Sequence, residues 1–499
     1  MRTIRQQQKG SVMLDRFDPA ELSENVRSRF YIGGQWVSPR TDARLDLISP
    51  LTEQVQFSVP AAAPEDMDAA VSAASEAFEN GPWPRLTPAE RARYLIAMGQ
   101  EVEKRLDLFK RVWTAQVGVV NGFSGMISGL IPHYFTYFAG LAETYPFEED
   151  RPTPGGRARV IREPVGVCAL ILPWNSPLIL LVAKLCPALL AGCTVVAKPS
   201  PETPLDALIL AECADAVGLP PGVFNVVPAD REAGDHLICD RRIDKVSFTG
   251  STAAGRHIGA VCADRVARYS LELGGKSAAI ICEDADLAAA IPAVTPVSMP
   301  FSGQICFAQT RMLVPERRKD EVVDAYRAAV ESIKVGDPWE DDVGMGPLAM
   351  RRQQDRVFDY LDIGRKEGAR IVTGGGRGAF NSGFFVQPTI FDGVTPDMRI
   401  AQEEIFGPVV SIIAYRDEEE AIRIANDSNF GLSGTVFTPD LERGENIARR
   451  VRTGNISVNG LQLDPSVPFG GFKQSGLGRE GGPEGLEAYL EIKSIYLPA

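Results

Sequence analysis

The chain has 499 residues, a length that corresponds to about three domains and is ample for a large buried core. Hydrophobic residues make up 44% and charged residues 23%, as in an ordinary globular protein, and 65 acidic against 52 basic side chains give a net charge of −13. This balance disfavours a nucleic-acid partner, and no basic stripe offsets it.

The first forty residues predict a loose tail that leads into a hairpin over residues 30–37. No apolar segment follows the basic start (residues 1–5), so we expect no secretory signal. Further along, Thr87 is the expected N-cap of a helix, with Pro88 at its first position and Glu90 completing a capping box.

One apolar stretch, residues 177–197, is long enough to span a bilayer. Lys184 near its middle would be costly in lipid, and Pro187 and Gly192 interrupt the helix. We expect instead a buried helix over residues 178–190, followed by a strand, in a soluble cytoplasmic protein without a membrane partner.

Strands and helices alternate over residues 158–280, which predicts βα units and a largely parallel sheet of an α/β fold. A second α/β set follows, with a helix expected over 321–333 and a strand over 409–415. Residues 158–162 and 492–497 alternate with charge on one face, as partly exposed or interface strands do. The apolar strands of the first set are expected at 165–172, 194–197, 223–227, 245–248 and 277–282.

The eight cysteines and three histidines predict neither a disulfide framework nor a metal site. The cysteines form no C-x-x-C pair, and most lie in apolar runs, as small buried thiols in a reducing compartment do. The histidines form no i, i+4 pair, so we expect no metal ion.

Cys306 lies between Ile305 and Phe307, a position more typical of a core residue. The alternative is that the preceding Ser302-Gly303-Gln304, interpreted as a flexible polar loop, presents the sulfur to a cleft. A nucleophilic thiol needs exposure and a lowered pKa. No cation lies nearby in sequence to lower the pKa of Cys306, but the N-terminus of a helix beginning near this residue could do so.

Two polar side chains at the ends of apolar segments are further candidates. Glu272 lies between leucines and before two glycines, where an ion pair with Lys276 is the simpler interpretation and a general base of raised pKa the functional one. Asn175 follows a buried strand in a loop fixed by two prolines, as a turn former or as a neutral donor to an oxyanion.

Gly250 and Gly255 delimit a G-x-x-x-x-G stretch that follows a strand and opens a helix. It matches neither the dinucleotide fingerprint nor a phosphate loop, yet a helix N-terminus with small residues lets a pyrophosphate approach. Earlier in the chain, Lys198 follows the expected strand 194–197. It would therefore lie at the edge where α/β sheets bind ligands, although solvated lysines are common there.

In chain order, five segments resemble motifs of the aldehyde dehydrogenase superfamily, and the resemblance spans about residues 28–498. Each motif alone is modestly specific, but five in the right order leave little room for coincidence. They resemble the family's oxyanion loop, general-base motif, nucleophile loop, nicotinamide-ribose segment and late glycine-rich signature, in that order: Pro173-Trp174-Asn175, Glu272-Leu273-Gly274-Gly275-Lys276, Gly303-Gln304-Ile305-Cys306, Glu404-Ile405-Phe406-Gly407-Pro408-Val409 and residues 468–476.

The resemblance implies an NAD(P)-dependent, non-acylating oxidation of an aldehyde to a carboxylic acid. Cys306 would attack the aldehyde, Asn175 and the Cys306 N–H would hold the oxyanion, and Glu272 would activate water against the thioester. Lys184 falls where the family has a lysine near the base; alternatively, its ammonium group extends to the helix surface. The cofactor-binding positions implied are Pro173, Trp174, Lys198, Ser200, Gly250, Ser251, Gly255, Leu273, Glu404 and Phe406.

The same resemblance implies a Rossmann-like cofactor domain, a second α/β catalytic domain and a small β oligomerisation element. It therefore implies a homodimer or a dimer of dimers, a homotetramer. The expected boundaries are 15–146 with 165–274 for the cofactor domain, 275–467 for the catalytic domain, and 147–164 with 485–499 for the oligomerisation strands.

The positions that resemble the family's substrate tunnel are nearly all apolar, and none is a lysine or arginine. Ser176 and Ala183 are small where many relatives carry aromatic rings, which implies a wide channel. We therefore expect an uncharged, apolar aldehyde of medium or large size, because a charged one would be buried without compensation. These positions are Ser176, Ile179, Leu180, Ala183, Pro300, Ile305, Phe307 and Phe469.

Two departures from the family pattern matter. Pro201 stands where the family has a glutamate for the adenosine ribose, and Glu202 comes one place late, so we expect NAD with some tolerance of NADP. Pro483 stands where many relatives have a second glutamate, so a proton relay through that position is not assumed.

Three rival functions remain at this point. An acylating enzyme that uses coenzyme A commonly lacks the base, so Glu272 argues against it. An inactive structural protein on the same fold should have lost Cys306, Asn175 or Glu272, and all three are present. A thiol hydrolase without redox chemistry would form no NADH.

Overall fold

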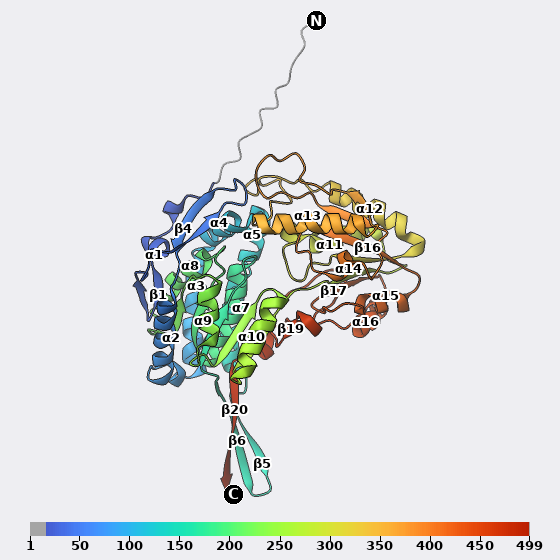
Figure 1. The fold of residues 1–499 in the computed structure, drawn as a ribbon. Coiled ribbons are helices and arrows are strands. Elements are labelled where there is room, and N and C mark those ends of the chain that lie inside the picture. Colours follow the sequence, from blue (N-terminus) through green and yellow to red (C-terminus); the bar gives the residue numbers. More distant parts are fainter. Residues whose placement is uncertain (1–15, 499) are drawn as a thin grey trace, which may run out of the picture.

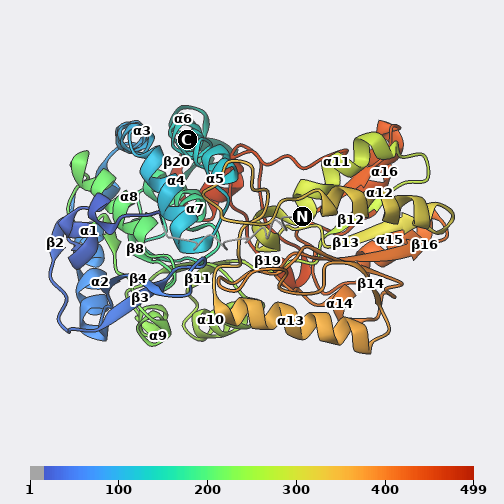
Figure 2. The ribbon, with the colours of Figure 1, turned by 90° about the horizontal axis from the view of Figure 1, so that it is seen from above.

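The computed structural model describes residues 16–498. The expectation of no secretory signal concerns residues 1–5 and lies outside them, as do residues 15 and 499 of the expected domain boundaries. The predicted α/β class is confirmed: two large sheets, each covered by helices, form two lobes that lie side by side (Figures 1 and 2).

The first lobe is built on an eight-stranded sheet whose central strands are parallel. Helices cover both faces, so apolar side chains point both ways: Val195 and Ala197 belong to one core cluster, whereas Val196 belongs to the other. The sheet order is β19-β11-β10-β7-β8-β9-β1-β2. The bounds are β1 Phe30–Ile32, β2 Gln35–Val37, β7 Val167–Ile171, β8 Thr194–Lys198, β9 Phe224–Val226, β10 Lys245–Thr249, β11 Arg268–Glu272 and β19 Gly476–Leu477.

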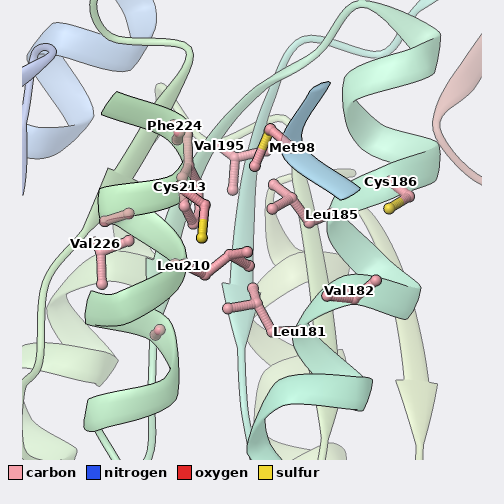
Figure 3. Packing of buried hydrophobic residues seen from close by; sticks show 14 of the residues in the cluster. Met98, Leu181, Val182, Leu185, Cys186, Val195, Leu210, Cys213, Phe224 and Val226 are labelled. Carbon is pink, nitrogen blue, oxygen red and sulfur yellow. The ribbon is translucent and has the colours of Figure 1, made fainter. Parts of the chain in front are cut away.

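Helix α7 (Pro177–Ala191) is the buried helix expected from the sequence. Pro177 takes its first position, and Gly192, with a φ of 100°, ends it. Apart from Lys184 the helix is apolar, and all its residues except Ile179 and Leu180 are buried, Lys184 completely. Figure 3 shows Leu181 and Leu185 of this helix beside residues of strands β8 and β9 and of helix α8 (Leu205–Ala216).

The N-terminal part has more regular structure than the sequence predicted. The expected hairpin is confirmed as β1–β2, and the capped helix as α3 (Pro88–Glu103). The prediction of a loose tail is wrong for the described residues 16–29, because Ser23 caps α1 (Glu24–Ser28) and Val26 of this helix is buried in the core. The other elements that cover the first lobe are β3 Arg44–Ile48, β4 Val55–Pro60, α2 Pro64–Glu79, α4 Leu106–Val117, α5 Asn121–Ser128, α6 Ile131–Thr144, α9 Arg231–Cys239, α10 Thr252–Asp264 and α17 Gly482–Glu487.

The second lobe is built on a seven-stranded, mostly parallel sheet of order β14-β15-β16-β13-β12-β17-β18. The helix and strand expected in this part are confirmed as α12 and β16. The strand expected at 277–282 is β12, and it lies inside this sheet rather than beside the strands that precede it in the chain. The bounds are β12 Ala278–Ile281, β13 Arg311–Pro315, β14 Arg370–Thr373, β15 Thr389–Asp392, β16 Val409–Tyr415, β17 Gly434–Phe437, β18 Ser457–Val458, α11 Leu287–Ser298, α12 Lys319–Glu331, α13 Arg351–Lys366, α14 Arg399–Gln402, α15 Glu418–Asn426 and α16 Leu441–Arg450.

A three-stranded antiparallel sheet, β20-β6-β5, projects from the base of the first lobe (Figure 1). It consists of β5 (Glu148–Thr153), β6 (Gly156–Pro164) and β20 (Leu490–Pro498), so the two segments with one-sided charge pair with each other. Ile492 and Tyr496 of β20 are 69% and 76% exposed. No helix within residues 16–498 combines the length and the apolar character needed to cross a bilayer.

Candidate active site

Two cavities of different chemistry meet at Cys306. The first, which we call the tunnel, has a volume of about 810 Å³ and a mainly apolar wall. The second, which we call the cleft, has a volume of about 1170 Å³ and is bounded by the ends of β10 and β11, the start of α10 and the start of α13. Asn175, Leu180 and Cys306 line both cavities, so molecules bound in the two would come together there.

The turn before Cys306 is buried and held in place, which corrects the prediction of a flexible polar loop. Ser302 has a φ of 60°, and its Oγ donates to the carbonyl oxygen of Gly346 at 2.8 Å. The Gln304 side chain accepts from the Ala349 N–H at 3.0 Å. Gly303 has a φ of 73°, and a Cβ there would lie 2.1 Å from the carbonyl oxygen of Gly407, so only glycine fits.

Burial raises the pKa of the Cys306 thiol well above its usual value, and the nearby carboxylates of Glu404 and Glu272 raise it further. The backbone N–H groups of Cys306 and Phe307 oppose this shift. Residues 304–310 form turns and extended chain, so the expectation of a helix N-terminus at the cysteine is wrong. The thiol is therefore neutral until a base removes its proton.

Asn175 is buried and fixed by contacts on both sides. Its Nδ2 donates to the backbone carbonyl oxygen of Gln304 at 2.9 Å, and the backbone carbonyl oxygen of Asn175 accepts from Trp113 Nε1 at 2.8 Å. An amide nitrogen carries two N–H donors, so one is left for a ligand where the cavities meet. The bond to Gln304 also ties Asn175 to the cysteine turn.

Glu272 ends strand β11 with a buried carboxylate, and neither oxygen has a hydrogen-bond partner within residues 16–498. Burial raises its pKa well above the usual value, and the Glu480 carboxylate adds to this, whereas Lys184 and Arg479 oppose it. The expected ion pair with Lys276 is wrong, because Lys276 Nζ also lacks a partner among the described residues. Glu272 is thus a carboxyl group that keeps its proton to a higher pH than an exposed glutamate does.

Lys184 lies next to this carboxylate rather than at the helix surface. Its side chain is fully buried, and Nζ donates to Thr249 Oγ1 at 2.6 Å and to Glu480 Oε1. The alternative in which the ammonium group reaches solvent is therefore wrong. Glu480, three residues before Pro483, was not singled out from the sequence.

The cleft has a wall suited to an anion and a diol. Gly250 precedes α10, and Ser251 caps this helix by accepting from the Ala254 N–H at 3.3 Å, so a helix N-terminus faces the cleft. At the other end, Glu404 Oε1 accepts from the Gly275 N–H at 3.0 Å, and burial raises the pKa of this carboxyl to about 7.

Close approach of Glu404 depends on a glycine. A Cβ at Gly274 would lie 2.3 Å from the second carboxylate oxygen of Glu404. Beside it the rings of Trp174 and Phe406 pack edge to face, with centroids 5.4 Å apart. The residues present therefore fit a bound dinucleotide, with a pyrophosphate near α10 and a ribose near Glu404.

Residues 36–495 match the sequence model described as the Aldehyde dehydrogenase family. The chain belongs to this family. Similar proteins include geranial dehydrogenase of Castellaniella defragrans, 47% identical over 94% of this chain and 98% of that protein. The 3-succinoylsemialdehyde-pyridine dehydrogenase of a Pseudomonas species is 45% identical over 93% of this chain and 98% of that protein.

Solved structures of aldehyde dehydrogenases have the same fold. The Mycobacterium tuberculosis enzyme complexed with NAD+ superposes with a TM-score of 0.93 at 46% identity and covers 94% of this chain and 98% of that one. The Staphylococcus aureus betaine aldehyde dehydrogenase in complex with NAD+ superposes with a TM-score of 0.92 at 36% identity, with 94% of each chain covered.

In this aldehyde dehydrogenase, most of the residues predicted for the site come together. Of the eight predicted tunnel residues, all line the tunnel except Pro300, which begins the buried turn and leaves Phe301 to form the wall. Of the predicted cofactor residues, Lys198, Ser200 and Gly255 do not line the cleft. Those that do are Pro173, Trp174, Gly250, Ser251, Leu273, Glu404 and Phe406.

These three residues lie outside the cleft wall for different reasons. Lys198 is buried at the end of β8, with its side chain against Gly234 of α9. Ser200 donates to Glu202. Gly255 lets α10 approach β11, since a Cβ there would lie 2.6 Å from a methyl group of Leu273.

Sequence reasoning missed the far wall of the tunnel and part of the cleft. Trp113, Phe123 and Tyr134 reach the tunnel from α4, α5 and α6, which no local motif connects with Cys306. Asp464 and Glu480 add carboxylates to the same cavity. The cleft also includes Arg352, Gln353 and Arg356 of α13. Residues 16–498 contain no group of three or more His, Cys, Asp or Glu side chains that could hold a metal ion.

Proposed function

We propose that this aldehyde dehydrogenase oxidises an uncharged, apolar, medium-sized or bulky aldehyde to the carboxylic acid through a thioester on Cys306, with hydride transfer to NAD+. The observation that carries the proposal is the position of Cys306, where an apolar tunnel meets a cleft that fits a dinucleotide. Each cavity delivers one reactant to the sulfur.

In the first half of the reaction, Cys306 gives up its thiol proton, one of the two protons released to solvent over the turnover, and its Sγ attacks the aldehyde carbon. The oxyanion that develops would accept from the free N–H of Asn175 Nδ2 and from the Cys306 backbone N–H, two donors already fixed in the protein. NAD+, when bound, supplies the hydride acceptor. Glu404 and Phe406 would seat the nicotinamide ribose, and Gly250 and Ser251 the pyrophosphate.

In the second half, Glu272 would take a proton from the water that attacks the thioester. Its raised pKa makes the ionised Glu272 a stronger base than an ordinary carboxylate. Hydrolysis breaks the C–S bond, forms a C–O bond and returns the thiol. Over a complete turnover, one aldehyde, one water and one NAD+ give one carboxylate, one NADH and two protons. Lys184 and Glu480, paired beside Glu272, would balance the charge of this carboxylate.

The tunnel wall supports an uncharged substrate. Among residues 16–498, no lysine or arginine lines it, and Asp464 and Glu480 would repel a carboxylate substituent. Ser176 and Ala183 leave room for a bulky chain. Two similar proteins are named for geranial and for a semialdehyde of a substituted pyridine, and neither name denotes a small aliphatic aldehyde.

We also infer the larger organisation. The first lobe (15–146 and 165–274) would bind the cofactor, the second (275–467) would carry the nucleophile, and 147–164 with 485–499 would mediate assembly in a cytoplasmic homodimer or dimer of dimers. The exposed apolar residues of β20, an edge strand, support the assembly. A monomer in sedimentation at micromolar concentration would contradict it.

The proposed function is tested by initial rates over a panel of aldehydes with NAD+ and NADP+ in parallel. Hexanal and benzaldehyde should give a higher kcat/KM than acetaldehyde, because each buried methylene adds at most about 0.8 kcal/mol. NADH should form without coenzyme A, and NADP+ should support some turnover. A higher kcat/KM for succinic semialdehyde or betaine aldehyde than for hexanal and benzaldehyde would overturn the substrate assignment.

A further inference from the structure

An ion pair joins the two lobes at the solvent edge of the cleft. A guanidinium nitrogen of Arg352, on α13, lies 2.6 Å from Glu202 Oε1 in the loop after β8. The other oxygen of Glu202 accepts from Ser200 Oγ, so both carboxylate oxygens are engaged. Arg352 itself lines the cleft, and its side chain is 65% exposed.

The place of Glu202 in the fold gives this ion pair its significance. Strands β7 and β8 are parallel neighbours joined by α7, which makes a βαβ unit. In dinucleotide-binding folds, an acidic side chain after the second strand of such a unit accepts from the 2′-hydroxyl of the adenosine ribose, and a nearby arginine accommodates the 2′-phosphate of NADP. Glu202 is the acidic residue that follows β8, and Arg352 is the arginine beside it.

We propose that Arg352 determines how far this enzyme discriminates between NAD and NADP. By holding Glu202, it occupies the carboxylate that would otherwise bind a 2′-hydroxyl and repel a 2′-phosphate. Its planar guanidinium also matches phosphate geometry. This inference rests on the proposed NAD-linked function and assigns to it a residue that selects the cofactor.

The surroundings favour the exchange of Glu202 for a phosphate on Arg352. An ion pair this exposed contributes little to stability, so releasing it costs little. Lys198 Nζ, which donates to the Pro199 carbonyl oxygen at 3.2 Å, is a second cation close to Glu202. The same ammonium group also interacts with the Asp230 carboxylate, so the positive charge available to a 2′-phosphate is that of the Arg352 guanidinium.

The test is calorimetric titration of NAD+ and of NADP+ into the full-length protein and its variants. Arg352→Ala should weaken NADP+ binding by about tenfold or more, the loss expected for a charge-assisted contact, and should leave NAD+ binding unchanged or tighter. Arg352→Lys should keep part of the NADP+ affinity because it retains the charge. Glu202→Gln should shift the preference the other way, toward NADP+.

Arg351→Ala is the matched control. Arg351 precedes Arg352 on the same helix, but it pairs with Glu53, and it is not among the residues that line the cleft. Removing its charge should leave the ratio of the NAD+ and NADP+ dissociation constants unchanged. A ratio that stays within about twofold of wild type in Arg352→Ala, or that falls equally in Arg351→Ala, would overturn the inference.

Failure of the inference differs from failure of the proposed function. If aldehydes are oxidised but the ratio does not respond to Arg352→Ala, only the assignment of Arg352 fails. If the ratio responds but wild-type protein oxidises no aldehyde, the proposed function fails and the assignment stands as a property of nucleotide binding.

Discussion

The tunnel and the cleft share Cys306 but differ in almost everything else. The tunnel is walled by aromatic and aliphatic side chains, including the edge-to-face pair Trp113 and Phe301, whose ring centroids lie 5.5 Å apart. The cleft is walled by glycines, a helix N-terminus, the carboxylates of Glu272 and Glu404 and cations from α13. Under the proposed function, the tunnel wall would select an aldehyde by shape, and the cleft wall would bind polar groups of the cofactor.

If the proposed function holds, separate side chains determine which aldehyde binds and which groups react. A change in the tunnel wall should alter which aldehyde reacts without altering cofactor affinity. A change at Cys306 or Glu272 should stop the chemistry with either cavity still able to bind its ligand. Substitutions can therefore be ordered by how close they lie to the junction.

The largest effect is expected from Cys306→Ala. Loss of the nucleophile should lower kcat by at least about a thousandfold, whereas calorimetry should find NAD+ affinity retained because the cleft is otherwise intact. Cys239→Ala, at an exposed cysteine, is the control and should keep full activity. More than a small fraction of wild-type kcat in Cys306→Ala would break the link between the two cavities.

Glu272→Gln should have the next largest effect, restricted to the second half of the reaction. Steady turnover should fall by about a hundredfold or more, as expected when a general base is lost, because the thioester persists. Stopped-flow absorbance should still record a burst of NADH. If the burst and the turnover vanish together, Glu272 acts earlier, on the thiol itself.

Ala183→Trp should sharpen the contrast on the tunnel side. Ala183 is buried on α7 and lines the tunnel, so a large ring there should lower kcat/KM for bulky aldehydes by about tenfold or more while sparing short ones. Affinity for NAD+, measured in parallel, should not change. Equal losses for acetaldehyde and for benzaldehyde would show that the substitution damages the fold rather than the tunnel.

The smallest effect concerns pH. The Glu272 carboxylate raises the pKa of the Cys306 thiol, so Glu272→Gln removes a negative neighbour and should lower that pKa. Alkylation of Cys306 by iodoacetamide, followed against pH without cofactor, should therefore reach its midpoint at lower pH in the variant. A midpoint that is unchanged or higher would show that the two groups do not interact.

Sequence reasoning succeeded where a motif and a local pattern coincide. The apolar run of α7, with Pro177 at its start and Gly192 after its end, fixes a buried helix, and the loops before it carry Asn175. Sequence reasoning failed where contacts between distant segments determine the secondary structure. Strand β11 begins with Arg268 and Tyr269 and has no apolar run, yet pairing with β10 makes it a strand and places Glu272 at its end.

In the site, too, residues within motifs were predicted and residues brought in by tertiary contacts were missed. Lys184 had no visible partner in the sequence, because Glu480 lies 296 residues away and reaches it only after folding. Likewise Trp113, Phe123 and Tyr134 enter the tunnel from helices that precede its motifs in the chain. The identity of the reacting groups was predictable from motifs, whereas the walls and the charges around them depend on tertiary contacts.

The most direct test of the central claim is the mass of the peptide that contains Cys306. Glu272→Gln protein should be mixed with NAD+ and an apolar aldehyde such as hexanal, quenched in acid and digested. The Cys306 peptide should gain the mass of one acyl group, only when NAD+ is present, and Cys306→Ala should gain none. An unmodified Cys306 peptide during the NADH burst, or an acyl group on another cysteine, would contradict the account.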